Sequence, residues 1–205
     1  MRLSTKFRGG FSLTELLVVI VIIIVLAGFT IGALPGIQNR INRARVEAFL
    51  GELSSGLSRY QVEYGNYPLS PKGGVSSDDL SYRDTEGLNG SGVLYKNLSG
   101  DRDLDGEVDE NEVIYVQNLG GKANENSKNK RSIGDPNGSG YLVIDSFNSP
   151  IRYLADPPRR IRNGKEIPKL TINPDFDLWS IVDTDPSKAN DPQVQLEYVT
   201  NWTRN

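Results

Sequence analysis

The feature that most constrains the fold is an uninterrupted apolar segment near the N-terminus, "LLVVIVIIIVLAGFTIGAL", from Leu16 to Leu34. These 19 residues contain no charged side chain, and as a helix they would span about 28 Å, close to the hydrocarbon thickness of a bilayer. Arg2, Lys6 and Arg8 precede the segment and predict a cytoplasmic N-terminal flank, with the rest of the chain crossing outward. A removed secretory signal peptide is the alternative, but it would have a shorter apolar stretch and a small-residue cleavage site. The pattern therefore predicts a membrane-spanning helix.

Composition excludes several classes of chemistry. The chain of 205 residues contains neither cysteine nor histidine, which removes disulfides, thiolate metal sites and catalysis by Ser-His-Asp or Cys-His groups. Its net charge is −3 and it has no long basic run, so nucleic acid is not an expected partner. Hydrophobic residues make up only 37% of the chain, and many of them lie before residue 35. The remaining residues can therefore form only a small soluble core.

The residues in front of the apolar segment, "RGGFSLTELL", place two glycines before Phe11 and an acid, Glu15, at the fifth position counted from Phe11. This stretch closely resembles the N-terminal signal of the type IV pilin superfamily. The resemblance implies removal of residues 1–10 by a prepilin peptidase, cleavage between Gly10 and Phe11, and N-methylation of the new Phe11 amine. A plain signal anchor is the alternative interpretation.

Glu15 stands at the edge of the apolar segment, where an unpaired charge costs about 2.5–3.5 kcal/mol on insertion scales. Cleavage would leave an equally costly ammonium group on Phe11. The two charges can neutralise each other, within one chain or between neighbouring subunits of a filament. We therefore predict that Glu15 is an assembly residue; the alternative is an interfacial acid that reaches the lipid headgroups.

Beyond Pro35 an apolar stripe recurs at helical spacing and predicts an amphipathic helix over residues 36–65. The stripe consists of Ile37, Ile41, Ala44, Ala48, Leu53, Leu57, Tyr60 and Tyr64. "YGNYP" ends this helix, with Gly65 as the C-cap and Pro68 as the breaker, a phrase that ends the long helix in many pilins. Glycines and Pro35 between the two halves predict a local bend. Residues 69–100 read as a loop with one helical turn, and short strands are expected at 113–117, 141–144, 151–154 and 176–182.

The segment "DRDLDGEVDENE", residues 101–112, fits the twelve-residue calcium-loop template with an acid at every key position and a glycine for the sharp turn, Gly106. Hard oxygen donors at alternating positions can converge on one cation, whereas clustered carboxylates without a cation would repel one another. The predicted ligands are Asp101, Asp103, Asp105, Glu107 through its carbonyl, Asp109 and Glu112. An exposed acidic turn is the alternative. The following "VIYV" favours a strand, so the loop is set in a scaffold other than an EF-hand.

Three C-terminal segments, "DSFNSPIRYL", "DFDLWS" and "YVTNW", resemble parts of the major pseudopilin of type II secretion, the protein G family. That family holds calcium in the loop between its last two segments. The resemblance therefore implies a second set of metal ligands: Leu178, Ser180, Asp183 and Asp185. The Gly-Pro-Asp-Gly turn usual in the family is replaced here by "IVDTDPSKAND".

These observations predict an α+β, pilin-like fold: a long N-terminal helix, its first half transmembrane, packed on a small antiparallel sheet with long loops. The expected parts are a leader (1–10), a transmembrane and filament-core helix (11–35), an amphipathic helix (36–65) and a periplasmic head with its calcium loop (66–205). The resemblance implies a non-enzymatic subunit of the type II secretion pseudopilus at the inner membrane. It also implies that its partners are further copies, minor pseudopilins, the prepilin peptidase and an inner-membrane assembly platform.

Two other functions stay open. One is a type IV pilin or minor pilin for adhesion, motility or DNA uptake, which the missing cysteine pair and the C-terminal segments disfavour. The other is a signal-anchored enzyme using Asp175 and Asp177, with Trp179 stacking on a sugar; packed aromatic side chains are the simpler explanation of the tryptophans.

Overall fold

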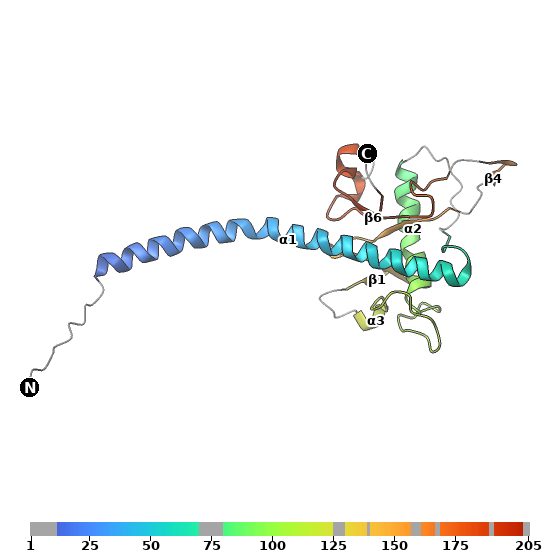
Figure 1. Cartoon of the computed structure of the whole chain (residues 1–205), viewed down its shortest axis with the longest axis horizontal. Coiled ribbons are helices and arrows are strands. Elements are labelled where there is room, and N and C mark those ends of the chain that lie inside the picture. The colour runs from blue at the N-terminus through green and yellow to red at the C-terminus, as the bar shows by residue number, and fades with distance from the viewer. Residues whose placement is uncertain are drawn as a thin grey trace, which may run out of the picture. The chain divides into compact units, whose positions relative to one another are not determined.

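The computed structural model describes residues 12–69, 80–124, 130–138, 140–156, 161–166, 169–188 and 191–202. Within these ranges the side chains of 30–35, 80–87, 123–124, 162 and 192 are not described. The chain divides into two compact units, Met1–Ile41 and Asn42–Asn205. We call the helical residues 13–41 the N-terminal segment and residues 42–205 the head unit (Figure 1). The predicted leader, residues 1–10, lies outside the described residues.

Helix α1, Leu13–Tyr64, is 52 residues long. Its residues up to Ile41 belong to the N-terminal segment, and the remainder belong to the head unit. The helix continues without unwinding through Gly28, Pro35 and Gly36. A proline removes one backbone hydrogen bond from a helix, and here the turns on both sides of it remain helical. The predicted C-terminal end is confirmed, because Gly65 has a φ of 81° and its N–H donates to the Gln61 carbonyl at 2.8 Å.

Helix α2, Leu80–Leu98, occupies most of a region that we expected to be a loop. Its glycines and serines weaken helix propensity but let the helix approach the sheets closely. Gly90 lies so near the Tyr153 carbonyl that a Cβ there would overlap it, and Ser91 Oγ donates to the Val143 carbonyl at 3.0 Å. Tertiary contact therefore supplies the stability that the local sequence lacks.

The strands form three small antiparallel sheets. Strand β1 (Ser132–Gly134) pairs with β2 (Tyr141–Val143), and β6 (Asp177–Ser180) lies between β3 (Arg152–Leu154) and β7 (Val199–Thr200). A separate hairpin joins β4 (Ile161–Arg162) to β5 (Lys165–Glu166). The strands predicted within 141–144, 151–154 and 176–182 are confirmed. The coarse prediction of an α+β chain with a long N-terminal helix and small antiparallel sheets is also confirmed.

The strand predicted at 113–117 is wrong. The N–H groups of Tyr115 and Val116 both donate to the Leu98 carbonyl, at 3.1 and 3.0 Å, so this segment turns back onto the end of α2. In the described part of the head unit there are also three short helical elements: α3 (Gly121–Asn124), η1 (Pro186–Lys188) and α4 (Pro192–Gln195).

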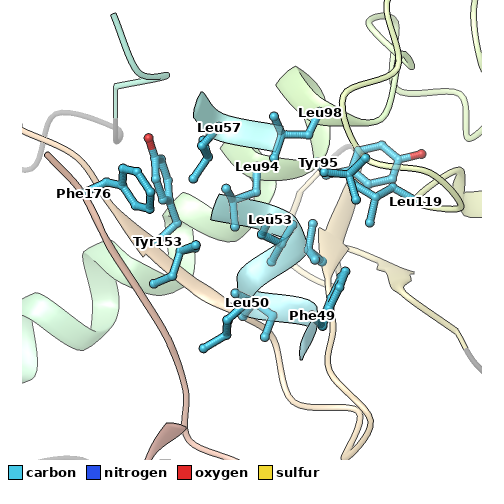
Figure 2. Close-up of a cluster of buried hydrophobic side chains, with 14 of the residues drawn as sticks. Phe49, Leu50, Leu53, Leu57, Leu94, Tyr95, Leu98, Leu119, Tyr153 and Phe176 are labelled. Carbon is cyan, nitrogen blue, oxygen red and sulfur yellow. The ribbon is translucent and has the colours of Figure 1, made fainter. Parts of the chain in front are cut away.

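The head unit has its own apolar core, in which side chains of α1 and α2 meet those of the sheets (Figure 2). Leu53 and Leu57 of the predicted stripe are fully buried, and Leu94 and Tyr153 pack in the same cluster. Nearer the start of the unit the buried positions on α1 differ from those expected: they are Val46, Phe49 and Leu50, whereas Ala44 and Ala48 are exposed.

Candidate functional site

Glu15, the predicted assembly residue, is bound to the start of its own helix. The Ser12 N–H donates to Glu15 Oε2 at 2.9 Å, and the Glu15 N–H donates to Ser12 Oγ at 3.2 Å. This reciprocal arrangement is a capping box, and its Ser-x-x-Glu spacing was readable in the sequence. The Ser12 backbone N–H is the main cause that lowers the pKa of Glu15. Gly10 and Phe11, the predicted cleavage and methylation positions, lie outside the described residues.

The apolar side chains that follow Glu15 are exposed around the whole helix. Every side chain from Leu16 to Leu26 that is larger than alanine is between 46% and 64% exposed, and Phe29 is 76% exposed. An amphipathic surface helix has one apolar stripe, whereas a helix that is apolar on all sides needs cover on all sides. The described side chains of the N-terminal segment thus form no apolar core of their own.

The expectation of a single-pass inner-membrane protein is corrected by the structure. Among the residues that the structure describes, no helix is long and apolar enough to cross a membrane.

The acidic loop of residues 101–112 brings three of its six predicted metal ligands together. Carboxylate oxygens of Asp101, Asp103 and Asp109 all lie within 4.8 Å of one another. The loop turns sharply, with positive φ angles at Leu104 (65°) and Gly106 (93°). The convergence is the geometry that the calcium-loop template predicts for these positions.

Asp101 is the buried anchor of this loop. Its side chain is fully enclosed, and its Oδ2 accepts hydrogen bonds from Tyr95 Oη at 2.7 Å and from the Gly106 N–H at 2.8 Å. Tyr95 itself is fully buried, and its hydroxyl also accepts from the Gly121 N–H at 3.0 Å. Tyr95 therefore fixes the loop to α2, a role that its apolar sequence context did not reveal.

The side chains of Asp105, Glu107 and Glu112 are paired with cations of the chain, although the predicted metal ligand of Glu107 is its backbone carbonyl. Lys122 Nζ lies 3.4 Å from Asp105 Oδ2 and 3.3 Å from Glu107 Oε1, and Arg102 Nε lies 3.1 Å from Glu112 Oε2. The hydrogen bond to Glu107 is the main cause that raises the pKa of Lys122, while the Glu107 backbone N–H lowers that of Asp105. Asp105, Glu107 and Lys122 are exposed and Glu112 is partly buried, and solvent screens such pairs so that they contribute little to stability. An incoming divalent cation could displace them at little cost, so the donor set fits calcium.

The second predicted ligand set is not gathered in this way. Ser180 is buried and its hydroxyl is bonded to the Asp145 carboxylate, and Asp185 Oδ1 accepts from the Ser187 N–H at 2.9 Å, which caps η1 and lowers the pKa of Asp185. Leu178 is also buried, and Asp183 is exposed. Within the described ranges, the only group of three or more potential metal ligands is the one at Asp101, Asp103 and Asp109.

Two of the three side chains considered for an enzyme, Asp177 and Trp179, are used in capping and packing, whereas Asp175 is exposed. Asp177 is buried and accepts from the N–H groups of Ile172 and Asn173, at 2.7 and 2.9 Å. Trp179 is 3% exposed and packs edge-on against Trp202, with ring centroids 5.8 Å apart. Trp179 therefore offers no free face for stacking on a sugar.

Comparison with known proteins adds no relative: no family model matches the chain, no curated protein matches it, and no solved structure matches it.

Proposed function

We propose that this chain is a structural subunit of a filament, the pseudopilus of a type II secretion system. The observation that carries the proposal is the contrast within one chain between a head unit with a complete core and an N-terminal segment whose apolar side chains are exposed on every side. A single partner would cover only one stripe of such a helix. Several identical helices packed together would cover all of it.

Copies that meet through different surfaces build open, helical assemblies rather than closed rings unless the rotation between them closes. A filament core formed by the N-terminal segments satisfies this geometry, with the head units outside it. Growth of such a filament would act mechanically, by pushing cargo, and would require no active site in the subunit.

The C-terminal segments that carry the resemblance also support the proposal. In the structure the "DLWS" and "TNW" segments are neighbours, because β6 pairs with β7 in the register Trp179–Thr200. Asn201 reinforces the pair: its N–H donates to the Leu178 carbonyl at 3.0 Å, and its Oδ1 accepts from the Leu178 N–H at 2.9 Å. The two segments thus act as one structural feature of the head unit.

In the processed subunit, we propose that Glu15 of an incoming copy pairs with the Phe11 amine of a copy already in the filament. The capping box gives Glu15 a second role, and the two roles can be separated experimentally. Glu15→Gln keeps the capping geometry, since glutamine serves at this position of the box, but removes the charge. Ser12→Ala removes the cap and keeps the charge.

We expect Glu15→Gln to abolish polymerisation of the processed chain, measured by sedimentation and electron microscopy, and Ser12→Ala to preserve it. Mass spectrometry should show a mature chain that begins at methylated Phe11. Normal filaments of Glu15→Gln, or a mature N-terminus elsewhere, would contradict the proposal. Circular dichroism of both variants would verify that the head unit is folded.

We also propose that the acidic loop binds calcium, through Asp101, Asp103 and Asp109 first, with Asp105, the Glu107 carbonyl and Glu112 completing the set. When bound, the ion would neutralise clustered carboxylates and hold the loop in a single conformation. Because the chain has no cysteine, such an ion would take the place of a disulfide as a cross-link in a loop-rich head.

A further inference from the structure

The head unit contains a pocket of about 410 Å³, a size typical of ligand pockets. It lies between α1 and the segment that follows β2. Phe49 and Ile144 contribute its apolar floor, and three cations line it: Arg45, Lys130 and Arg131.

The positive charge of this pocket is only partly matched. Arg131 is committed, since its Nη1 lies 2.8 Å from Glu52 Oε2 and its guanidinium carbon is 4.8 Å from the centre of the Phe49 ring. Asp145 also lines the pocket, but its oxygens accept from Phe147, Ser149 and Ser180, and burial raises its pKa. Arg45 and Lys130 are exposed and have no ion pair among the described residues. The pocket is therefore suited to an anionic group attached to an apolar one.

The acidic loop presents such a combination on the same head unit. Glu110 is exposed, stands at a position that the calcium-loop template does not use, and makes no ion pair with any described residue. Val108 and Val113, on either side of it, are 45% and 47% exposed. A carboxylate flanked by exposed valines matches both the charge and the apolar floor of the pocket.

The pocket and the acidic loop lie at opposite ends of the β1–β2 pair. At one end the Ile144 N–H donates to the Arg131 carbonyl at 2.9 Å, and both residues line the pocket. At the other end Gly140 and Tyr141 lie against Leu104 and Gly106 of the loop. Surfaces of opposite charge at two ends of one element can join copies head to tail, which is the type of contact that extends a filament.

We propose that the acidic loop of one copy docks in the pocket of a second copy, with Glu110 placed between Arg45 and Lys130. The proposal rests on the proposed function, because it supplies the contact between head units of neighbouring subunits. Electrostatic complementarity of this kind fixes the register between partners, and like charges placed together in a contact are strongly unfavourable.

Charge reversal tests the contact in the full processed chain. Lys130→Glu and Glu110→Lys should each raise the concentration needed for polymerisation by about tenfold or more, and the chain carrying both changes should recover. Lys165→Glu, an identical change on the exposed strand β5, is the matched control and should have no effect.

Cross-linking tests proximity directly, because the chain has no cysteine of its own. A chain with Val113→Cys and Ser146→Cys keeps Glu110 and Lys130 and places one thiol beside Glu110 and one at the pocket. Treated with a short bismaleimide, it should give a ladder of dimers, trimers and larger products. Val113→Cys with Lys165→Cys should remain monomeric.

Filaments that depend on Glu15 but show no ladder and no effect of charge reversal would overturn the contact and leave the proposed function intact. A ladder that forms equally in a Glu15→Gln chain would support the contact and count against the proposed function. Absence of a ladder, with thermal stabilisation by inorganic sulfate that requires Lys130, would show that a small anion occupies the pocket and would also overturn the contact.

Discussion

The N-terminal segment and the head unit differ in how far their leucine side chains are exposed. Leu17 in the N-terminal segment is 54% exposed, whereas Leu53, on the same helix within the head unit, is fully buried. Burial of a leucine contributes about 1.5–3 kcal/mol relative to exposure. The head unit obtains that stabilisation from its own chain, and the N-terminal segment can obtain it only from other molecules.

The difference teaches that one continuous helix carries two separate sources of stability. Within the head unit, α1 contributes to folding; before it, the proposed function assigns the helix a role in association. Mutations on the two parts of α1 should therefore have effects of different kinds.

The largest effect is expected from truncating the same residue type in the two regions. Leu53→Ala removes core contacts and should lower the free energy of unfolding of the head unit by about 2–5 kcal/mol, measured by urea denaturation. Leu17→Ala should change it by less than about 0.5 kcal/mol, since the side chain has no described core to leave, and should instead weaken polymerisation. Equal destabilisation by both variants would refute the division.

Calcium should stabilise the head unit, which contains the acidic loop, and should not stabilise the N-terminal segment. At 100 times the dissociation constant, calcium should raise the free energy of unfolding by about 2.7 kcal/mol, and a chelator should reverse the gain in thermal melts. Asp103→Asn should abolish the gain, and Glu110→Gln, which alters no predicted ligand, should retain it. Glu112→Gln should reduce the gain if the residue leaves Arg102 to bind the ion. Identical melts with calcium and chelator would exclude the metal site.

Glycine-to-alanine substitutions should have opposite effects where a helix packs against a strand and where it faces open space. Gly90→Ala would force a methyl group onto the Tyr153 carbonyl and should destabilise the head unit by about 1–3 kcal/mol. At Gly51, on α1 within the head unit, an added methyl group would have no packing neighbour within 4 Å. Gly51→Ala should therefore stabilise the head unit by about 0.5–1 kcal/mol. Chemical denaturation of both variants provides the comparison, and a stable Gly90→Ala chain would contradict the close approach.

The smallest effect concerns pH. The pKa of Asp145 in the head unit is raised, whereas the pKa of Glu15 in the N-terminal segment is lowered. Burial raises the pKa of Asp145 in the folded head unit, so its contribution to stability is complete at low pH and is lost as the pH rises through the folded pKa. Glu15 has a lowered pKa, so its cap stabilises the helix at neutral pH and fails as the solution is acidified.

Unfolding free energies of the wild type and Asp145→Asn, measured from acid to neutral pH, should separate the Asp145 contribution. The wild-type value minus the variant value should fall as the pH increases. A difference that is constant, or that rises with pH, would show that burial does not raise the pKa of Asp145.

The sequence was informative where local pattern and tertiary structure agree. The long apolar and amphipathic runs predicted α1, with its end at Gly65, and the β-branched and aromatic runs predicted β2, β3 and β6. Helix α2 was missed because Gly90 and Gly92 weaken the local helical signal, and the contact with Tyr153 that explains Gly90 lies more than sixty residues away. The strand expected at 113–117 failed for a similar reason, since its backbone bonds to Leu98.

At the acidic loop, the template predicted which residues could converge but not which other residues would hold them. The spacing indicated all six ligands, and three of them meet in the structure. Lys122 and Tyr95 are outside the twelve-residue motif, so only the folded chain shows that the first pairs with Asp105 and the second anchors Asp101. Arg102 lies within the motif and pairs with Glu112. The sequence alone therefore indicated that Arg102 would compete with the ion for this carboxylate.

The close approach at Gly90 has a consequence for tracing the ancestry of this molecule. Where a helix touches a strand through bare backbone, divergence can replace nearly every surrounding side chain, but any added atom at that point would push the layers apart. Distant descendants of the same ancestor should therefore retain a glycine opposite a strand carbonyl, in the middle of their second helix, long after ordinary sequence similarity has vanished.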